Sequence, residues 1–220
     1  MKIRSFALIA AAVLVFAALT ACGAKKPDGI ISQLRTDIYE GKTGECEFTA
    51  YAEEREIPLA ADGKAGTKMP VIIVKICDSA AFYGTYTVTV KIGGKEYSAA
   101  PELKADSLMK AVIPIAAPCK EKEIEVSLHG EKEIAATLRS VLPEDVCDVK
   151  KAVNKACDAL GEKIAYESRK PLGEIFARVL FENGTAYWYV GYINDGTVNA
   201  VLVSADGEQV VAEKIFPAEN

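Results

Sequence analysis

Hydrophobic and polar residues alternate with a period of two along most of the chain. In Cys46–Ala52 every second residue is apolar, and Thr85–Ile92 repeats the pattern. Successive side chains of a strand point to opposite faces, so this alternation is typical of strands with one buried face. The β-branched run Val71–Ile76 instead suits a strand that is covered on both faces.

Short strands of this kind recur at roughly ten-residue spacing through the first two thirds of the chain. Gly93-Gly94 permits a tight hairpin between two of them. Such spacing predicts an antiparallel β-sandwich over residues 33–142, with an Ig-like arrangement as the simplest interpretation. The segment Ile30–Tyr39 fits either a short helix or an entering strand. The expected strands are 46–52, 71–76, 85–92, 95–99, 111–115, 123–129 and 133–138.

At Pro143 the pattern changes to a helical period. Pro143, Glu144 and Asp145 are typical of a first helical turn, and Gly161 is a plausible stop. The apolar stripe of this helix consists of Val146, Val149, Val153, Cys157 and Leu160. Three or four strands are expected after Pro171, and Asn-Gly or Asp-Gly pairs separate them. These strands are 174–181, 186–193, 197–204 and 209–216. Residues 143–220 therefore predict an α+β domain whose helix covers a β-meander.

The first 21 residues form a secretion signal. Lys2 and Arg4 precede an apolar run from Phe6 to Leu19, which is too short for a comfortable membrane span. The closing residues Leu19-Thr20-Ala21-Cys22 resemble the lipobox of bacterial lipoproteins. This resemblance implies that residues 1–21 are removed, that Cys22 is acylated, and that residues 22–32 tether the body to the cell membrane. The expected location is the extracytoplasmic face.

Charge and cysteine content narrow the possible partners. Removing Lys2 and Arg4 from 26 basic residues leaves 24 against 31 acidic ones, a formal charge of −7. An acidic chain of this kind does not fit nucleic-acid binding. Five cysteines remain after Cys22, an odd number, and most of them are expected to be small buried residues. These are Cys46, Cys77, Cys119, Cys147 and Cys157.

The last third resembles a known family. The segment Ala200–Val211, with its Asp206-Gly207-Glu208 turn, is similar to the final hairpin of PepSY-like domains of exported bacterial proteins. The resemblance covers roughly Pro143 to Lys214 and implies a helix followed by a small antiparallel sheet. Members are associated with protease regulation or ligand sensing at the cell surface, and the resemblance implies no catalytic residue.

Catalytic signals are sparse. His129 is the only histidine, and its position at a strand end fits a surface residue. The acidic run Glu53-Glu54-Arg55-Glu56 lacks the spacing of a calcium loop, and no cysteine–histidine spacing indicates zinc. No catalytic residue, metal or cofactor is therefore expected.

One strand carries the strongest candidate for binding. Trp188 is the only tryptophan and alternates with Tyr187 and Tyr189, while Tyr192 falls on the Trp188 side. These rings either form core contacts or present a binding patch for a peptide or glycan.

The sequence favours a non-enzymatic binding or interaction module at the cell envelope, anchored through Cys22. Its partner would be an envelope protein, a peptide or a glycan. Two alternatives remain open: an envelope hydrolase that uses paired carboxylates, and a structural spacer. Neither the partner's identity nor the oligomeric state can be predicted from the sequence.

Overall fold

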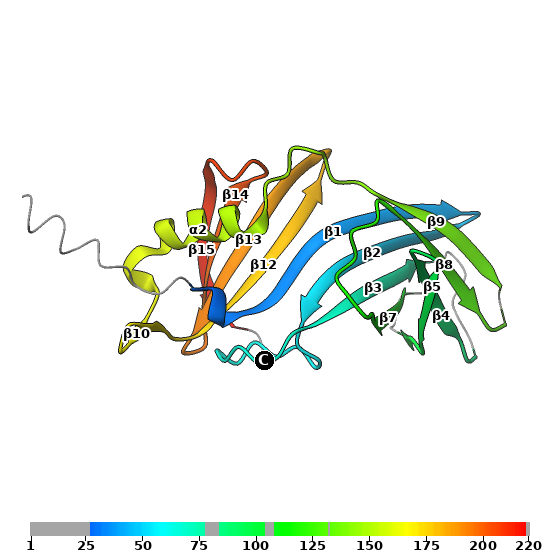
Figure 1. Cartoon of the computed structure of the whole chain (residues 1–220), viewed down its shortest axis with the longest axis horizontal. Coiled ribbons are helices and arrows are strands. Elements are labelled where there is room, and N and C mark those ends of the chain that lie inside the picture. Colours follow the sequence, from blue (N-terminus) through cyan, green and yellow to red (C-terminus); the bar gives the residue numbers. More distant parts are fainter. Residues whose placement is uncertain (1–26, 78–83, 104–107, 132, 219–220) are drawn as a thin grey trace, which may run out of the picture.

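The computed structural model describes residues 27–77, 84–103, 108–131 and 133–218 (Figure 1). Most of these residues lie in β-strands, and they include one short α-helix. The expected fold class, mainly β with an α+β part, is therefore confirmed at this level. Cys22 and the leader lie outside the described residues.

The elements follow the chain in two groups. The first group consists of η1 (Pro27–Ile30), β1 (Ile31–Thr43), β2 (Cys46–Arg55), β3 (Met69–Cys77), β4 (Thr87–Ile92), β5 (Lys95–Ala99), β6 (Glu102–Leu103), β7 (Leu108–Pro114), β8 (Glu123–His129) and β9 (Ile134–Ser140). The second consists of α2 (Val149–Leu160), η2 (Gly161–Lys163), β10 (Tyr166–Glu167), β11 (Lys170–Pro171), β12 (Glu174–Glu182), β13 (Thr185–Asn194), β14 (Thr197–Ser204) and β15 (Val210–Pro217).

The first group forms two layers around one core. Strands β2, β3 and β7 continue from β1 on one side, and β8, β4 and β5 continue from β9 on the other. Alternate side chains of both layers meet between them, as the period of two predicts. The largest fully buried ones include Phe48, Ile72, Met109, Leu128 and Leu138.

Strand β1 joins the two groups into one curled sheet. Its first half pairs in parallel with β12 at Ile31–Arg35, and Tyr39 and Glu40 pair with β9. The segment that fitted either a helix or a strand is therefore a strand. Ser32, expected in the tether, is buried in this strand. The division expected at residue 143 does not separate two sheets, because β1 belongs to both groups.

The helix α2 covers one face of the second group. Its buried residues, Ala152, Val153, Ala156 and Leu160, pack on the side of β13 and β14. Of the expected apolar stripe, Val153 and Leu160 are buried, Val149 and Cys157 are half-buried, and Val146 precedes the helix. Figure 1 shows α2 across β13–β15 at one end of the molecule, with β4, β5 and β8 at the other. The predicted stop at Gly161 is confirmed, since this residue ends the helix with a φ of 51°.

The helix begins later than the sequence indicates. We expected the first turn at Pro143, but the side chain of Asp148 caps the helix by accepting a hydrogen bond from the Lys150 N–H at 2.7 Å. The Cys147 N–H donates to the Ala205 carbonyl at 2.8 Å, which holds the preceding segment on the β14–β15 turn instead. Residues 142–148 therefore form a connection between β9 and α2 that contains a turn at Glu144 and Asp145 in place of the expected helical turn.

The expected hairpin turns of the second group are confirmed. Asn183 and Asp195 have φ angles of 51° and 48°, and the glycine after each is also positive. Two successive positive φ angles fit the twist of antiparallel strands joined by a two-residue turn. The meander β12–β13–β14–β15 therefore follows the sequence pattern closely.

Candidate functional site

The four candidate aromatic residues of β13 lie on two different faces. Trp188 and Tyr192 are 2% and 0% exposed and pack in the core beneath α2. Tyr187 and Tyr189 alternate with them and are half-buried on the opposite face. The four residues therefore do not form one exposed aromatic patch, because the helix covers every second ring.

Tyr192 has a structural role in this core. Its hydroxyl accepts a hydrogen bond from the Ala165 N–H at 2.9 Å and donates one to the Leu172 carbonyl at 3.1 Å. Both partners belong to the connection between α2 and β12. The ring therefore holds that connection against the sheet, and burial raises the pKa of its hydroxyl.

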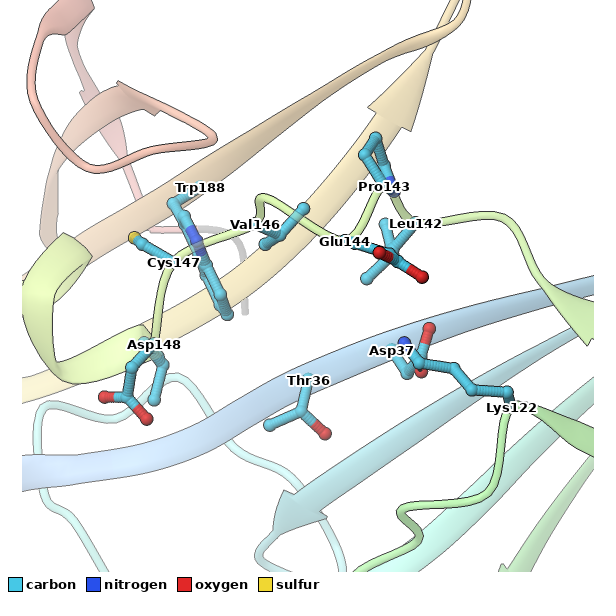
Figure 2. Close-up of a pocket in the computed structure, with 11 residues that line it drawn as sticks. Thr36, Asp37, Lys122, Leu142, Pro143, Glu144, Val146, Cys147, Asp148 and Trp188 are labelled. Atoms are coloured by element: carbon cyan, nitrogen blue, oxygen red, sulfur yellow. The ribbon is translucent and has the colours of Figure 1, made fainter.

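Trp188 is different, because its polar atom has no partner. Among the described residues, its indole Nε1 is the one buried side-chain nitrogen or oxygen without a hydrogen bond. The Cys147 thiol lies beside the indole (Figure 2) and is close enough for the indole to lower the pKa of that thiol, but the contact lacks the geometry of a hydrogen bond. Leaving a buried donor unsatisfied costs about 1–3 kcal/mol, so such groups call for an explanation.

Trp188 lines a pocket of about 490 Å³ between the two groups of strands. Figure 2 shows its walls: β1 on one side, the connection before α2 on the other, and Trp188 of β13 at one end. A pocket of this size accommodates a small ligand or a short peptide segment. It is lined by Thr36, Asp37, Lys122, Leu142, Pro143, Glu144, Val146, Cys147, Asp148, Val149 and Trp188.

The pocket carries an excess of negative charge. Its lining contains three carboxylates, those of Asp37, Glu144 and Asp148, against the single ammonium of Lys122. Asp37 is fixed by hydrogen bonds from the Ile38 N–H at 2.8 Å and the Ser140 hydroxyl at 2.6 Å. Its ion pair with Lys122 is long, at 3.8 Å. The pocket therefore favours a cationic ligand.

The thiol of Cys147 also faces this region. Burial raises its pKa, and the Lys151 ammonium and the Trp188 indole partly oppose that shift. A Cβ added at Gly207 would lie 2.8 Å from the Cys147 sulfur, so the turn glycine leaves room for the thiol. Raised pKa values favour the protonated thiol, which is a poor nucleophile.

The other chemical signals lie elsewhere. His129 is exposed, and its Nδ1 lies within hydrogen-bond distance of Glu133 Oε2, at 2.8 Å. No disulfide joins two of the described cysteines, and only Cys46 is buried, so the expectation that most of the five are buried is wrong. Within residues 27–77, 84–103, 108–131 and 133–218, no group of His, Cys, Asp or Glu is arranged to hold a metal ion.

Several pocket residues could not be recognised from the sequence. Thr36 and Asp37 belong to β1, and Lys122 precedes β8. All three come near Trp188 only because the strands pair over long distances in the sequence. One signal was present: Asp37 directly precedes the apolar pair Ile38-Tyr39, and a carboxylate that is buried in a strand needs fixed hydrogen-bond partners.

Comparisons with family models, with curated proteins and with solved structures find no match for this chain. None of the helices in the described part is long and apolar enough to cross a membrane.

Proposed function

We propose that this protein is a lipid-anchored, non-enzymatic binding module on the extracytoplasmic face of the cell membrane. Its ligand is a short peptide, which enters the Trp188 pocket with its free amino group. The observation that carries the proposal is the buried indole N–H without a partner at the end of a pocket. A peptide carbonyl there would accept that hydrogen bond.

The charge of the pocket supports an amine. The carboxylates of Glu144 and Asp37 lie at the end of the pocket away from Cys147 (Figure 2). An ammonium placed there would face net negative charge, and the apolar side chains of Leu142, Val146 and Val149 would contact the peptide's own side chains. A ligand with an ammonium at one end and a carbonyl acceptor near it fits this arrangement.

Anchoring rests on the sequence alone. The lipobox Leu19-Thr20-Ala21-Cys22 supports acylation of Cys22. At most about 3.5 Å per residue, the nine steps along the backbone from Cys22 to Ile31 keep the start of β1 within roughly 30 Å of the lipid. The pocket would then collect peptides close to the membrane surface.

The proposal can be tested with residues 23–220, which contain every contact described above. The probe is a pool of random tripeptides with free amino ends, compared with the same pool after N-acetylation. Trp188 is the only tryptophan, so its emission reports on the pocket alone. We expect a saturable change with the free pool and about tenfold weaker binding after acetylation, because a hydrogen bond to a charged group contributes about 1.5–3 kcal/mol.

A pocket-filling variant provides the control. Thr36 is exposed on β1 and lines the pocket, so Thr36→Arg should block binding without disturbing the core. Thr87→Arg makes the same change at an exposed position of β4, away from the pocket lining, and should bind like the wild type. Equal binding of the free and acetylated pools, or by both variants, would contradict the proposal.

A further inference from the structure

A second charged surface lies on the sheet face opposite α2. On β12, Ile175, Ala177 and Val179 pack beneath the helix, so Arg178 points to the other side. Arg178 is in register with Arg35 of β1, and Arg35 is in register with Glu53 of β2. These side chains therefore form a row across the strands that join the two groups.

Hydrogen bonds connect the side chains of this row, and each arginine donates only through its Nε atom. Arg35 Nε donates to Glu53 Oε1 at 2.7 Å, and Gln33 Nε2 donates to Glu53 Oε2 at 2.7 Å. Arg178 Nε donates to Gln33 Oε1 at 2.6 Å, and Arg55 Nε donates to the Glu56 carbonyl at 3.2 Å. Each arginine therefore uses its Nε in these bonds.

The terminal Nη groups of these arginines take no part in the bonds described above. Across the described part of the chain, their Nη atoms donate no hydrogen bond to protein, and the nearest ionic contact is Arg55 Nη1 to Glu53 Oε2 at 3.7 Å. The side chains of all three arginines remain partly exposed, so their terminal nitrogens lie at the surface. The donors that remain suit an added acceptor.

The charges in this cluster do not balance. Three guanidiniums surround the single carboxylate of Glu53, which is fully buried, and the side chains of Arg35 and Arg55 are only 17% and 14% exposed. Burial lowers the pKa of Arg178, and the charge of Arg35 adds to that effect. Like charges in neighbouring positions of a sheet are destabilising. Although the protein has a net negative charge, this half-buried cluster of three arginines and Glu53 thus has an excess of about two positive charges.

Aromatic rings fix the arginines. The Arg35 guanidinium carbon lies 4.0 Å from the centre of the Tyr51 ring, and that of Arg178 lies 5.1 Å from the centre of Phe176. Contacts with ring faces order a guanidinium while its edges stay available for hydrogen bonds. The cluster is therefore preorganised for an anion.

We propose that Arg35, Arg55 and Arg178 bind a carboxylate side chain of an acidic peptide segment in a partner protein. The planar fork of arginine matches a carboxylate, which can accept two hydrogen bonds from it. Because the guanidiniums are mostly recessed, a single side chain can reach them, whereas the flat surface of a bilayer cannot. This anion-binding site is independent of the Trp188 pocket, since its net charge is positive and it lies on the other face of the sheet.

The test uses residues 23–220 and two fluorescein-labelled peptides, Gly-Glu-Gly-Glu-Gly-Glu-Gly and its Gln counterpart, in a fluorescence anisotropy titration. We expect the Glu peptide to bind at least about tenfold more tightly than the Gln peptide. Arg55→Gln keeps a donor for the Glu56 carbonyl and should weaken binding by a similar factor. Arg139→Gln, at an exposed residue of β9, should leave it unchanged.

Three results would overturn the proposal: equal affinity for the two peptides, equal loss in the Arg55 and Arg139 variants, or binding to anionic vesicles in place of the peptide. Arg178→Gln provides a second variant. Its melting temperature shows whether it folds, and in the folded variant loss of Glu-peptide binding supports the site. Retention of full binding by folded Arg55→Gln and Arg178→Gln would also overturn it.

Discussion

The Ser32 hydroxyl donates a hydrogen bond to the Glu174 carboxylate at 2.6 Å, although 142 residues separate them. Ser32 is the second residue of β1, and Glu174 begins β12. The Gly63 N–H donates to the other carboxylate oxygen of Glu174 at 2.8 Å, so the connection between β2 and β3 is bound to the same carboxylate. One buried carboxylate thus links three segments that are distant in sequence.

This carboxylate should make stability depend on pH. Burial raises the pKa of Glu174 despite the two hydrogen bonds. Its ionised form is therefore disfavoured in the folded state, and the fold should lose stability as the pH rises from the ordinary glutamate pKa of about 4.3 through the raised value. Urea unfolding between about pH 4 and about pH 8 should show a growing advantage of Glu174→Gln over the wild type. A gap that stays constant or shrinks with rising pH would contradict this.

Gly41 should resist substitution because β9 passes close to it. An added Cβ would lie 2.5 Å from Leu138 Cδ2 and 2.8 Å from the Thr137 carbonyl oxygen. Gly41→Ala is expected to lower the free energy of unfolding by about 1–3 kcal/mol, since the backbone must shift. At Gly29 an added Cβ meets nothing within 4 Å. Gly29→Ala should therefore change stability by less than about 0.5 kcal/mol, and equal effects at both positions in urea unfolding would refute the explanation.

Cys147 should react slowly with alkylating reagents. Its raised pKa leaves little thiolate at neutral pH, whereas Cys77 is exposed. Iodoacetamide labelling at about pH 7.5, followed by peptide mass mapping, should modify Cys77 first. Labelling of Cys147 should accelerate as the pH rises, and the free-amino tripeptide pool should slow it. Labelling of Cys147 at the rate of Cys77 would contradict this expectation.

Local signals in the sequence predict the second group of strands well. Asn183-Gly184 and Asp195-Gly196 specify two-residue turns by their own conformational preferences, without help from distant residues. The strands on either side therefore fall within one or two residues of the expected bounds. Thr197–Ser204 has the expected bounds, as does Glu123–His129 in the first group.

The pairing of β1 could not be predicted in this way. A bulge between Arg35 and Asp37 adds one residue and shifts the alternation of side chains. Ile31, Leu34 and Ile38 consequently have the spacing of a helical face. The parallel partner of this strand lies in β12, and no local pattern indicates a contact over that distance.

The candidate site was predictable only in part. Trp188 was singled out as the sole tryptophan, but the pocket around it combines Thr36 of β1 with Cys147 before α2. Arg35 and Arg178 meet through the same long-range pairing. A single sequence contains no information on which distant strands pair, so such sites emerge only from the fold.

The most direct test of the central claim follows the indole N–H of Trp188 by NMR. The chain has one tryptophan, so one indole cross-peak is expected in a ¹H–¹⁵N spectrum of residues 23–220. If a peptide carbonyl accepts its hydrogen bond, the free-amino tripeptide pool should move this peak downfield and slow its exchange with solvent, in step with saturation. An indole peak that stays in place while the peptides bind elsewhere would contradict the claim that the pocket is the binding site.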